Sequence, residues 1–314
     1  MKILIELPSW LGDTVMATPA IENLIGFYDS SEFTLVGSAN SIEILKNHPQ
    51  ISNTFVLKKK YSSTISISRE LSDFDKFFSF RNTFRSYIFR LLVRSKQKSV
   101  FKKSAYKKIH QVEKYTNFIN NSLKTKLTIG PLKIYQSNLS KNKYKDPQKK
   151  PQLGINPGAS YGSAKRWYPE EFSKVIIELS DRYDITILGG VKEKEIAFDI
   201  QRLIEKKGVT NYKNLAGKLS IAELISYISR FDLFITGDSG PMHIAAAFKI
   251  PTVSIFGPTK DIETSQWKNK NSIILKKNLP CRPCMKRECP LGHHNCMRLI
   301  KAKDVLTEIH SLSL

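Results

Sequence analysis

The chain has 314 residues, 41% of them hydrophobic, and its 50 Lys and Arg against 28 Asp and Glu give a formal net charge of +22. This length accommodates two ordinary globular domains, each with its own core. No run approaches the roughly 20 apolar residues that a membrane-spanning helix needs, and the N-terminus lacks the pattern of a secretory signal peptide. The composition excludes the transmembrane and secreted classes and predicts a cytoplasmic protein.

The positive charge is concentrated in one segment. Between Lys58 and Lys150 there are 24 Lys and Arg but only five Asp and Glu. A block of this size creates a field that attracts anions and anionic membrane surfaces. The block indicates an anionic partner, either a membrane-associated substrate or a nucleic acid, although any single lysine in it is more simply a solvated surface residue.

The first half of the chain alternates strand and helix patterns. The first strand ends before Pro8, and a helical pattern begins after Gly12 and Asp13. Asp13 is either a helix cap that accepts backbone N–H groups, or a catalytic base at the edge where open α/β sheets hold their active sites. Thr18-Pro19 is a helix-start signal. We expect strands at Ile3–Leu7, Phe33–Val36, Thr54–Leu57 and Lys76–Phe80, and helices at Pro19–Phe27 and Ile42–Asn47.

A polar, lysine-rich run at residues 135–151 lacks apolar periodicity and predicts a linker. After it, strand and helix patterns alternate again, from a strand at Leu153–Asn156 to a last helix at Ala302–Leu312. Two such runs predict an α/β protein of two Rossmann-like, doubly wound domains that face each other across a cleft. The expected domains are residues 1–150 and 151–314, and a return of the last helix to the first domain stays open.

Two loops of the second half have the composition of an anion-binding site. In "NPGASYGSAKRWYPEEF", small residues around Ser160 let backbone N–H groups approach a ligand closely, and Lys165 adds a positive charge beside them. A glycine-rich surface loop is the plainer alternative. The spacing is not that of a P-loop, and no G-x-G-x-x-G follows the first strand, so ATP hydrolysis and plain NAD binding lose support.

The other loop, "TGDSGPMHIAAAF", joins a strand to a helix. Ser239 and Gly240 can offer hydroxyl and N–H donors to a diphosphate at the helix N-terminus. His243 follows at the start of the helix, which favours a binding role for it. The alternatives are that Asp238 only caps the helix and that His243 is a structural residue.

Four cysteines lie in the stretch "CRPCMKRECPLGHHNCM". Their spacing, C-x2-C-x4-C-x6-C with two histidines inside it, is compatible with a tetrahedral structural zinc. A reduced, packed thiol cluster is the alternative. The sequence leaves both open for Cys281, Cys284, Cys289 and Cys296.

Six segments, in order and over nearly the whole chain, resemble the bacterial ADP-heptose:lipopolysaccharide heptosyltransferases of glycosyltransferase family 9, most closely the type II branch. They are "PSWLGDTVMATPAI", "NPGASYGSAKRWYPEEF", "NLAGKLSIAELI", "TGDSGPMHIAAA", "IFGPT" and "CRPCMKRECPLGHHNCM". The resemblance implies a GT-B architecture, with the acceptor on the N-terminal domain and the sugar nucleotide on the C-terminal domain. It also implies inverting transfer of L-glycero-D-manno-heptose from ADP-heptose, without a metal or cofactor. The "DFD" at residues 73–75 is interpreted as strand entry, not as a D-x-D metal motif.

The resemblance also implies roles for individual residues. Asp13 matches the general base, and Gly12 leaves room for the acceptor beside it. The stretch "FRNTFRS" is the candidate acceptor loop, with Arg81, Asn82 and Arg85. The expected donor-binding residues are Lys165 at the phosphates, Asp238 near the sugar, Leu219 at the adenine and Glu193 at the ribose, together with Ser160, Ser239, Gly240 and His243.

The basic first half then suits an anionic acceptor in a membrane, a lipid A core that carries Kdo and a first heptose, and it predicts peripheral contact with the cytoplasmic face of the inner membrane. Heptosyltransferase I or another family 9 enzyme is the alternative within the family. A nucleic-acid-binding protein and a nucleotide-sugar binder without catalysis are alternatives from other classes. A nucleic-acid-binding function leaves the Gly-Asp turn and the phosphate-type loops unexplained. A nucleotide-sugar binder without catalysis has no need of a base at Asp13.

Overall fold

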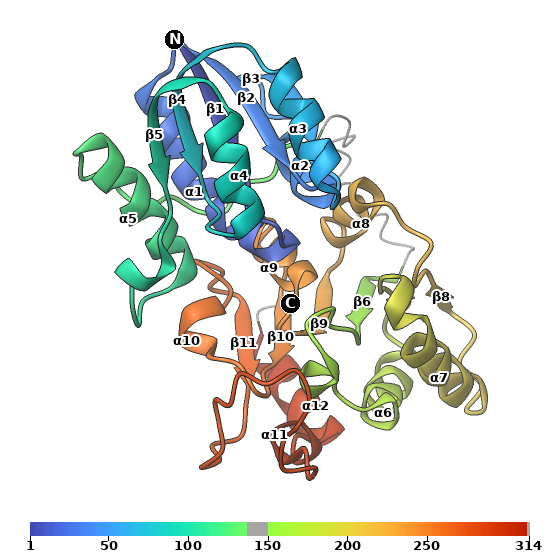
Figure 1. Cartoon of the computed structure of the whole chain (residues 1–314). Coiled ribbons are helices and arrows are strands. Elements are labelled where there is room, and N and C mark those ends of the chain that lie inside the picture. Colours follow the sequence, from blue (N-terminus) through green and yellow to red (C-terminus); the bar gives the residue numbers. More distant parts are fainter. Residues whose placement is uncertain (137–149, 313–314) are drawn as a thin grey trace. The chain divides into compact units, whose positions relative to one another are not determined.

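The computed structural model describes residues 1–136 and 150–312 (Figure 1). The chain divides into two compact units, Met1–Ser137 and Asn138–Leu314. Most of the linker predicted at residues 135–151 lies outside the described residues. Within the two described ranges, no helix combines the length and the apolar character that crossing a membrane requires.

The first unit is a five-stranded parallel sheet in the order β3-β2-β1-β4-β5 with helices between its strands. The four strands expected from the sequence are all present, with ends that differ by up to three residues. The order reverses between β1 and β4, which is where open α/β sheets bind their ligands. The strands are β1 (Lys2–Glu6), β2 (Glu32–Gly37), β3 (Ile51–Val56), β4 (Phe74–Ser79) and β5 (Ser95–Val100), and the helices are α1 (Leu11–Phe27), α2 (Ala39–Leu45), α3 (Tyr61–Glu70), α4 (Phe84–Leu92) and α5 (Gln111–Leu123), with a 3₁₀ turn at Lys103–Ala105.

The first helix does not restart at Thr18-Pro19, as the sequence predicted, but runs unbroken from Leu11 to Phe27 with Pro19 inside it. A proline at this position lacks the N–H that would bond the carbonyl of Val15, four residues earlier. The Thr18 hydroxyl donates to that carbonyl instead, at 2.7 Å. The Thr-Pro pair thus repairs a helix interior and does not begin a helix.

Helix α5 and strand β5 come from the part of the basic segment after Phe80, where the sequence predicted no elements. Strand β5 is an edge strand with the sequence SKQKSV, so it needs no apolar run to be stable. Helix α5 packs on α1 and completes an aromatic cluster, in which the ring of Phe80 lies 5.4 Å from that of Tyr115 and Phe101 lies 4.8 Å from Tyr115. Lys96 and Lys98 of β5 and Lys114 of α5 therefore belong to regular secondary structure.

The second unit is a six-stranded parallel sheet in the order β11-β10-β9-β6-β7-β8, whose order reverses between β6 and β9. The last helix packs within this unit, on α6, β10 and β11, and Glu171 accepts a hydrogen bond from the backbone of Ala302 at 2.7 Å. The strands are β6 (Gln152–Asn156), β7 (Asp184–Ile187), β8 (Tyr212–Asn214), β9 (Leu233–Gly237), β10 (Thr252–Ile255) and β11 (Ser272–Leu275); the helices are α6 (Pro169–Leu179), α7 (Lys194–Glu205), α8 (Ile221–Ile228), α9 (Gly240–Ala247), α10 (Asp261–Thr264), α11 (Asn295–Arg298) and α12 (Ala302–Ser311), with 3₁₀ turns at Ser163–Lys165 and Val191–Glu193.

Candidate active site

Asp13 lies in the first turn of α1, directly after β1, at the point where the order of the first sheet reverses. The N-cap position belongs to Trp10, so Asp13 is not the cap. Its side chain is half-buried, and its charge reaches the hydroxyl of Tyr115 on α5: burial and the nearby Asp13 carboxylate raise the pKa of Tyr115 well above its usual value. The positive end of α1 favours the ionised form of a carboxylate at this place.

A buried polar network underlies the same edge of the sheet. The Glu6 carboxylate, at the end of β1, accepts hydrogen bonds from the hydroxyls of Ser79 at 2.6 Å and Ser86 at 2.5 Å. Its other oxygen lies 3.5 Å from a guanidinium nitrogen of Arg81, a side chain that is only 8% exposed. Glu6 oxygen Oε1 and Arg81 Nε have no hydrogen-bond partner among the described residues. The sequence analysis missed Glu6 because it reads as one polar residue within an apolar strand.

The three residues predicted for the acceptor loop have different surroundings, and the fourth residue predicted for acceptor binding, Gly12, is half-buried in the first turn of α1. Arg81 is buried on Glu6, whereas Asn82 is exposed. Arg85 is half-buried on the first turn of α4, where its guanidinium donates to the carbonyl of Lys58 at 2.8 Å. The segment "FRNTFRS" is therefore a strand-to-helix turn, and the buried contact of Arg81 with Glu6 holds it against the sheet.

The buried carboxyl of Glu6 gives the protein a pH-dependent stability. Burial raises the pKa of Glu6 above its ordinary value of 4.5, so this stability is complete below pH 4.5 and is lost as the pH rises through the raised pKa. Glu6→Gln removes the titration. We expect the melting temperature of the wild type to fall relative to that of Glu6→Gln as the pH rises from about 4 to about 8. Glu70→Gln, which changes an exposed glutamate, is the control. A melting-temperature difference between the wild type and Glu6→Gln that is constant with pH would contradict the raised pKa of Glu6.

The second unit brings its two predicted anion-binding loops together. Lys165 ends the 3₁₀ turn after β6, and its ammonium lies 2.6 Å from the carboxylate of Asp238, which follows β9. Thr259 donates to the same carboxylate oxygen at 2.6 Å. Asp238 does not cap α9, because the N-cap residue is Ser239. Both partners are largely buried, so the Lys165–Asp238 ion pair fixes the lysine at the reversal point of the second sheet.

Asn156 connects the same two loops, although the sequence analysis named it only as the end of a strand and not as a site residue. Its amide lies at the end of β6 and is within hydrogen-bond distance of the Gly158 carbonyl at 3.2 Å, the Thr236 hydroxyl at 3.1 Å and the Ser239 hydroxyl at 3.3 Å. The signal for it was available, since an Asn directly before Pro-Gly at a strand end is a polar residue at the functional edge. Asn156 holds Ser239 in place at the N-terminus of α9.

The remaining predicted donor residues lie around this edge. Glu193 is buried, accepts a hydrogen bond from the backbone N–H of Gly190 at 2.7 Å, and packs so closely on Gly158 that a Cβ there would lie 1.9 Å from it. Its oxygen Oε1 has no hydrogen-bond partner within the described ranges. The others span the full range of exposure: Ser160 is exposed, Gly240 and Leu219 are half-buried and His243 is buried.

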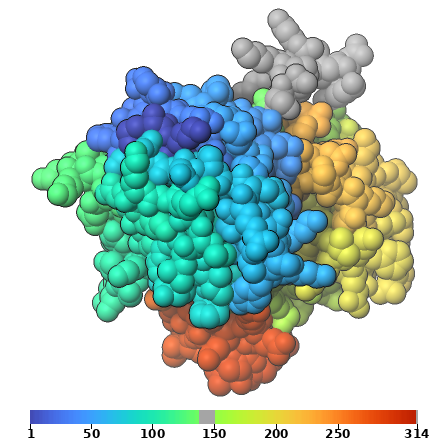
Figure 2. All heavy atoms as spheres, turned by 45° about the horizontal axis from the view of Figure 1, so that its top comes forward, coloured from blue at the N-terminus to red at the C-terminus, as the bar shows by residue number. Residues whose placement is uncertain are grey.

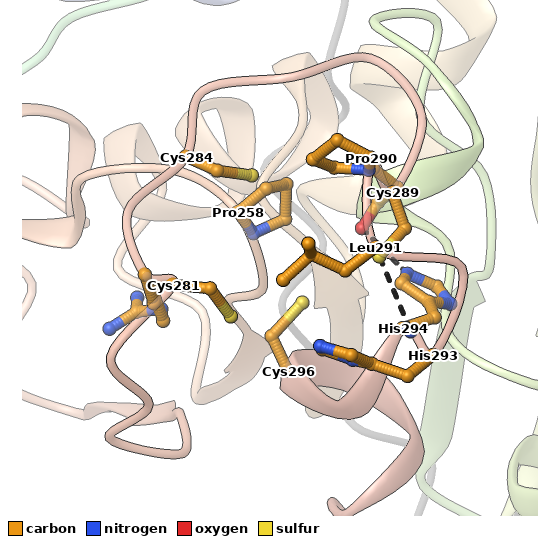
Figure 3. Close-up of a pocket in the computed structure, with 11 residues that line it drawn as sticks. Pro258, Cys281, Cys284, Cys289, Pro290, Leu291, His293, His294 and Cys296 are labelled. Atoms are coloured by element: carbon orange, nitrogen blue, oxygen red, sulfur yellow. Dashed lines mark hydrogen bonds between the residues drawn. The ribbon is translucent and has the colours of Figure 1, made fainter.

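The cysteine-rich loop forms a small pocket beside the Lys165 turn (Figure 3). None of the four cysteines forms a disulfide and all are half-buried, and burial and the neighbouring thiols raise the pKa of Cys296. In the part of the chain that the structure describes, no three His, Cys, Asp or Glu side chains are grouped so as to hold a metal ion. Cys281, Cys284, Cys289 and Cys296 line this one pocket together with His293 and His294.

This loop braces the Lys165 turn. The backbone N–H of Ala164 donates to the carbonyl of Arg287 at 3.0 Å, and His294 donates through Nε2 to the carbonyl of Ala164 at 2.9 Å. Because a carbonyl only accepts, Nδ1 of His294 is left to accept from the hydroxyl of Tyr168, at 3.0 Å. The tautomer of the neutral His294 ring is thereby set, and the histidine links the cysteine-rich loop to the turn at Ala164 and to Tyr168 at the start of α6.

Substitution His294→Ala tests this brace. Two hydrogen bonds of about 1 kcal/mol each are lost, and we expect the KM for the nucleotide donor to rise about tenfold with little change in the KM for the acceptor. Steady-state kinetics with each substrate varied in turn measures the split. The exposed His310→Ala is the matched control. Equal effects on both substrates would indicate general destabilisation and would contradict the brace.

Each of the two units is an α/β domain built on a parallel sheet whose strand order reverses once, at the edge where the candidate site residues lie. The family model "Glycosyltransferase family 9 (heptosyltransferase)" matches residues 81–295. Lipooligosaccharide heptosyltransferase 2 of Campylobacter jejuni serotype O:2 is 41% identical, over 99% of this chain and 98% of that protein. The chain belongs to glycosyltransferase family 9, as its motifs indicated.

Solved structures have the same fold. The structure of Escherichia coli ADP-heptose LPS heptosyltransferase II matches with a TM-score of 0.79 and 22% identity, over 99% of this chain and 98% of that one. Escherichia coli heptosyltransferase WaaC with ADP matches with a TM-score of 0.77 and 18% identity, over 99% of each chain. These matches confirm the predicted GT-B architecture with two Rossmann-like parallel sheets.

Proposed function

We propose that the chain transfers L-glycero-D-manno-heptose from ADP-heptose to the first heptose of the lipopolysaccharide or lipooligosaccharide inner core, with inversion and without a metal. The observation that carries this proposal is the 41% identity, over nearly the full length of both chains, to a lipooligosaccharide heptosyltransferase 2. Support for the donor comes from the related fold of WaaC, which was solved with ADP and with ADP-2-deoxy-2-fluoro heptose.

The second unit is proposed to bind the donor. A diphosphate at the N-terminus of α9 meets the backbone N–H groups and the hydroxyl of Ser239, and it competes with Asp238 for the ammonium of Lys165, 2.6 Å away in this structure. Asp238 is then free to face the donor sugar. We assign Glu193, with its buried unpartnered oxygen, to the ribose and Leu219 to the adenine. Ser160, Gly240 and His243 are proposed to complete the donor site.

The chemical step is proposed to be a single displacement. The ionised Asp13 takes the proton of the acceptor hydroxyl as its oxygen forms a bond to the anomeric carbon of the heptose. The bond from that carbon to the β-phosphate oxygen breaks, and its electron pair leaves with ADP. Lys165 and the N-terminus of α9 stabilise the negative charge that gathers on the diphosphate. Gly12, next to Asp13, leaves room for the acceptor.

The acceptor is proposed to bind at the reversal point of the first sheet. Three predicted residues follow β4 there: Arg81, which is paired with Glu6, and then Asn82 and Arg85. The surrounding excess of Lys and Arg attracts an acceptor that bears phosphates and Kdo. We propose that the enzyme works as a peripheral protein at the cytoplasmic face of the inner membrane, where this acceptor is made available.

An acceptor panel tests the proposal. Purified protein is incubated in EDTA with ADP-heptose and either Kdo2-lipid A or its monoheptosylated form, and ADP release is measured. The proposal predicts release with the monoheptosylated acceptor alone. Release with Kdo2-lipid A alone would assign the enzyme to heptosyltransferase I, and no release from an acceptor-saturated sample that still binds ADP-heptose would exclude both acceptors. Dependence on added divalent ions would overturn the metal-independent mechanism.

A further inference from the structure

Helix α4 carries large apolar side chains on two opposite faces. At 100° per residue, Ser86, Phe89 and Val93 share one face, and all three are buried in the core of the first unit. The opposite face presents Phe84, which is 72% exposed, together with the exposed residues Tyr87 and Leu91. An amphipathic helix on a sheet normally shows polar residues there, so the outer face of α4 lacks a partner of matching chemistry.

The surroundings of this outer face are basic. The guanidinium of Arg90 lies 4.9 Å from the ring centre of Tyr87, and Arg85 ties the start of α4 to the loop that contains Lys58, Lys59 and Lys60. Residues 84–94 contain three arginines and no acidic residue. Asp73 and Asp75, on the preceding segment, pair with Arg94 and Lys96. The positive charge next to the apolar face is therefore only partly neutralised.

Helix α3, which packs against α4, adds two more exposed apolar side chains, Tyr61 and Ile65. Figure 2 shows the α4 segment, in teal, on the visible surface of the first unit. We define the outer patch as Phe84, Tyr87 and Leu91 of α4 with Tyr61 and Ile65 of α3.

We infer that the outer patch docks on an anionic phospholipid bilayer. Short exposed helix faces with aromatic and Leu side chains bury them at the level of the lipid headgroups, and flanking Arg and Lys bind the phosphates. Contact with a second copy of this chain would instead bring the arginines of two patches together. A patch of five side chains is also small for a stable protein interface, which buries 20–30 residues a side. The inference deepens the proposed function, because it rests on an acceptor that is a membrane lipid.

Vesicle co-sedimentation tests the inference directly. Full-length protein is mixed with vesicles of phosphatidylcholine alone or with 30% phosphatidylglycerol, at low and at physiological salt. We expect binding to the anionic vesicles, and an at least tenfold weaker partition coefficient for the double variant Tyr87→Ser/Leu91→Ser, which leaves the candidate acceptor loop intact. The control is Phe198→Ser/Ile262→Ser, which changes two comparably exposed apolar residues of the second unit. The inference would be overturned if the double variant bound anionic vesicles as tightly as the wild type does. It would also be overturned if the wild type bound both vesicle types equally.

Kinetics separates this inference from the proposed function. With a deacylated, soluble acceptor, the Tyr87→Ser/Leu91→Ser variant is expected to keep wild-type ADP release within about twofold, which also shows that it folds. With the lipid acceptor in vesicles, its KM should rise at least tenfold. Equal loss with both acceptors would assign the patch to the active site and overturn membrane docking. If the wild type releases no ADP with either acceptor, the proposed function fails, whereas the vesicle result still decides the docking.

Discussion

Asp13→Asn is expected to reduce kcat by about 10²- to 10⁴-fold, the usual contribution of a positioned general base, while ADP-heptose binds as in the wild type. The substitution keeps the shape of the side chain but removes the carboxylate that we propose takes the proton of the acceptor hydroxyl. Stability changes little, because a first-turn carboxylate contributes about 0.3–1 kcal/mol to a helix. Single-turnover kinetics and calorimetric titration of ADP measure the two parts separately.

The matched control is Asp29→Asn, which changes an exposed aspartate of the same unit. Near-normal turnover of Asp13→Asn, with a lowered melting temperature, would leave Asp13 with only its electrostatic role at the start of α1. Parallel loss of donor binding would instead mean that Asp13 shapes the donor site and would contradict its assignment to the acceptor hydroxyl.

Lys165→Met is expected to lower kcat/KM by about 10²- to 10³-fold, as for other residues that stabilise a developing anion, with both donor affinity and turnover reduced. The ammonium of Lys165 is the cation that the structure fixes at the reversal point of the second sheet, 2.6 Å from Asp238. Its removal has a second effect, since the largely buried carboxylate of Asp238 loses its counter-charge.

Two further variants separate these effects. Lys165→Met/Asp238→Asn removes the unpaired carboxylate, so stability should recover while the loss of donor affinity remains. Lys174→Met removes a lysine that is 62% exposed and is paired with Glu171 on α6, and it should leave activity unchanged. If Lys165→Met retains wild-type affinity for ADP, the assignment of Lys165 to the diphosphate is wrong.

Much of the fold could be predicted because buried parallel strands consist of short apolar runs of sequence. The strands around Ile5, Leu35 and Phe77 were found for this reason. Strand β5 was not, because an edge strand does not need such a run, and α5 was hidden by the lysines around its aromatic residues. The helix break at Pro19 was predicted wrongly because Thr18-Pro19 is a local start signal, whereas the continuation of α1 depends on the Thr18 hydroxyl bonding Val15.

The candidate site was predictable in its residue types and not in its pairings. Glycine-rich loops and an Asp after a strand are visible in the sequence, so Asp13, Lys165 and Asp238 could be named. The ion pair between Lys165 and Asp238 joins residues 73 positions apart, and Glu6 with Arg81 spans β1 and β4. Such contacts depend on the order of the strands in the sheet, which a local sequence pattern does not determine.

The mass of the acceptor after reaction shows whether this protein transfers heptose and whether the transfer needs the Asp13 carboxylate. Monoheptosylated Kdo2-lipid A is incubated in EDTA with ADP-heptose and either wild-type protein or Asp13→Asn, and the products are analysed by mass spectrometry. We expect the acceptor to gain one heptose unit with the wild type and to remain unchanged with the variant. An unchanged acceptor with the wild type, or equal product from both proteins, would contradict this expectation.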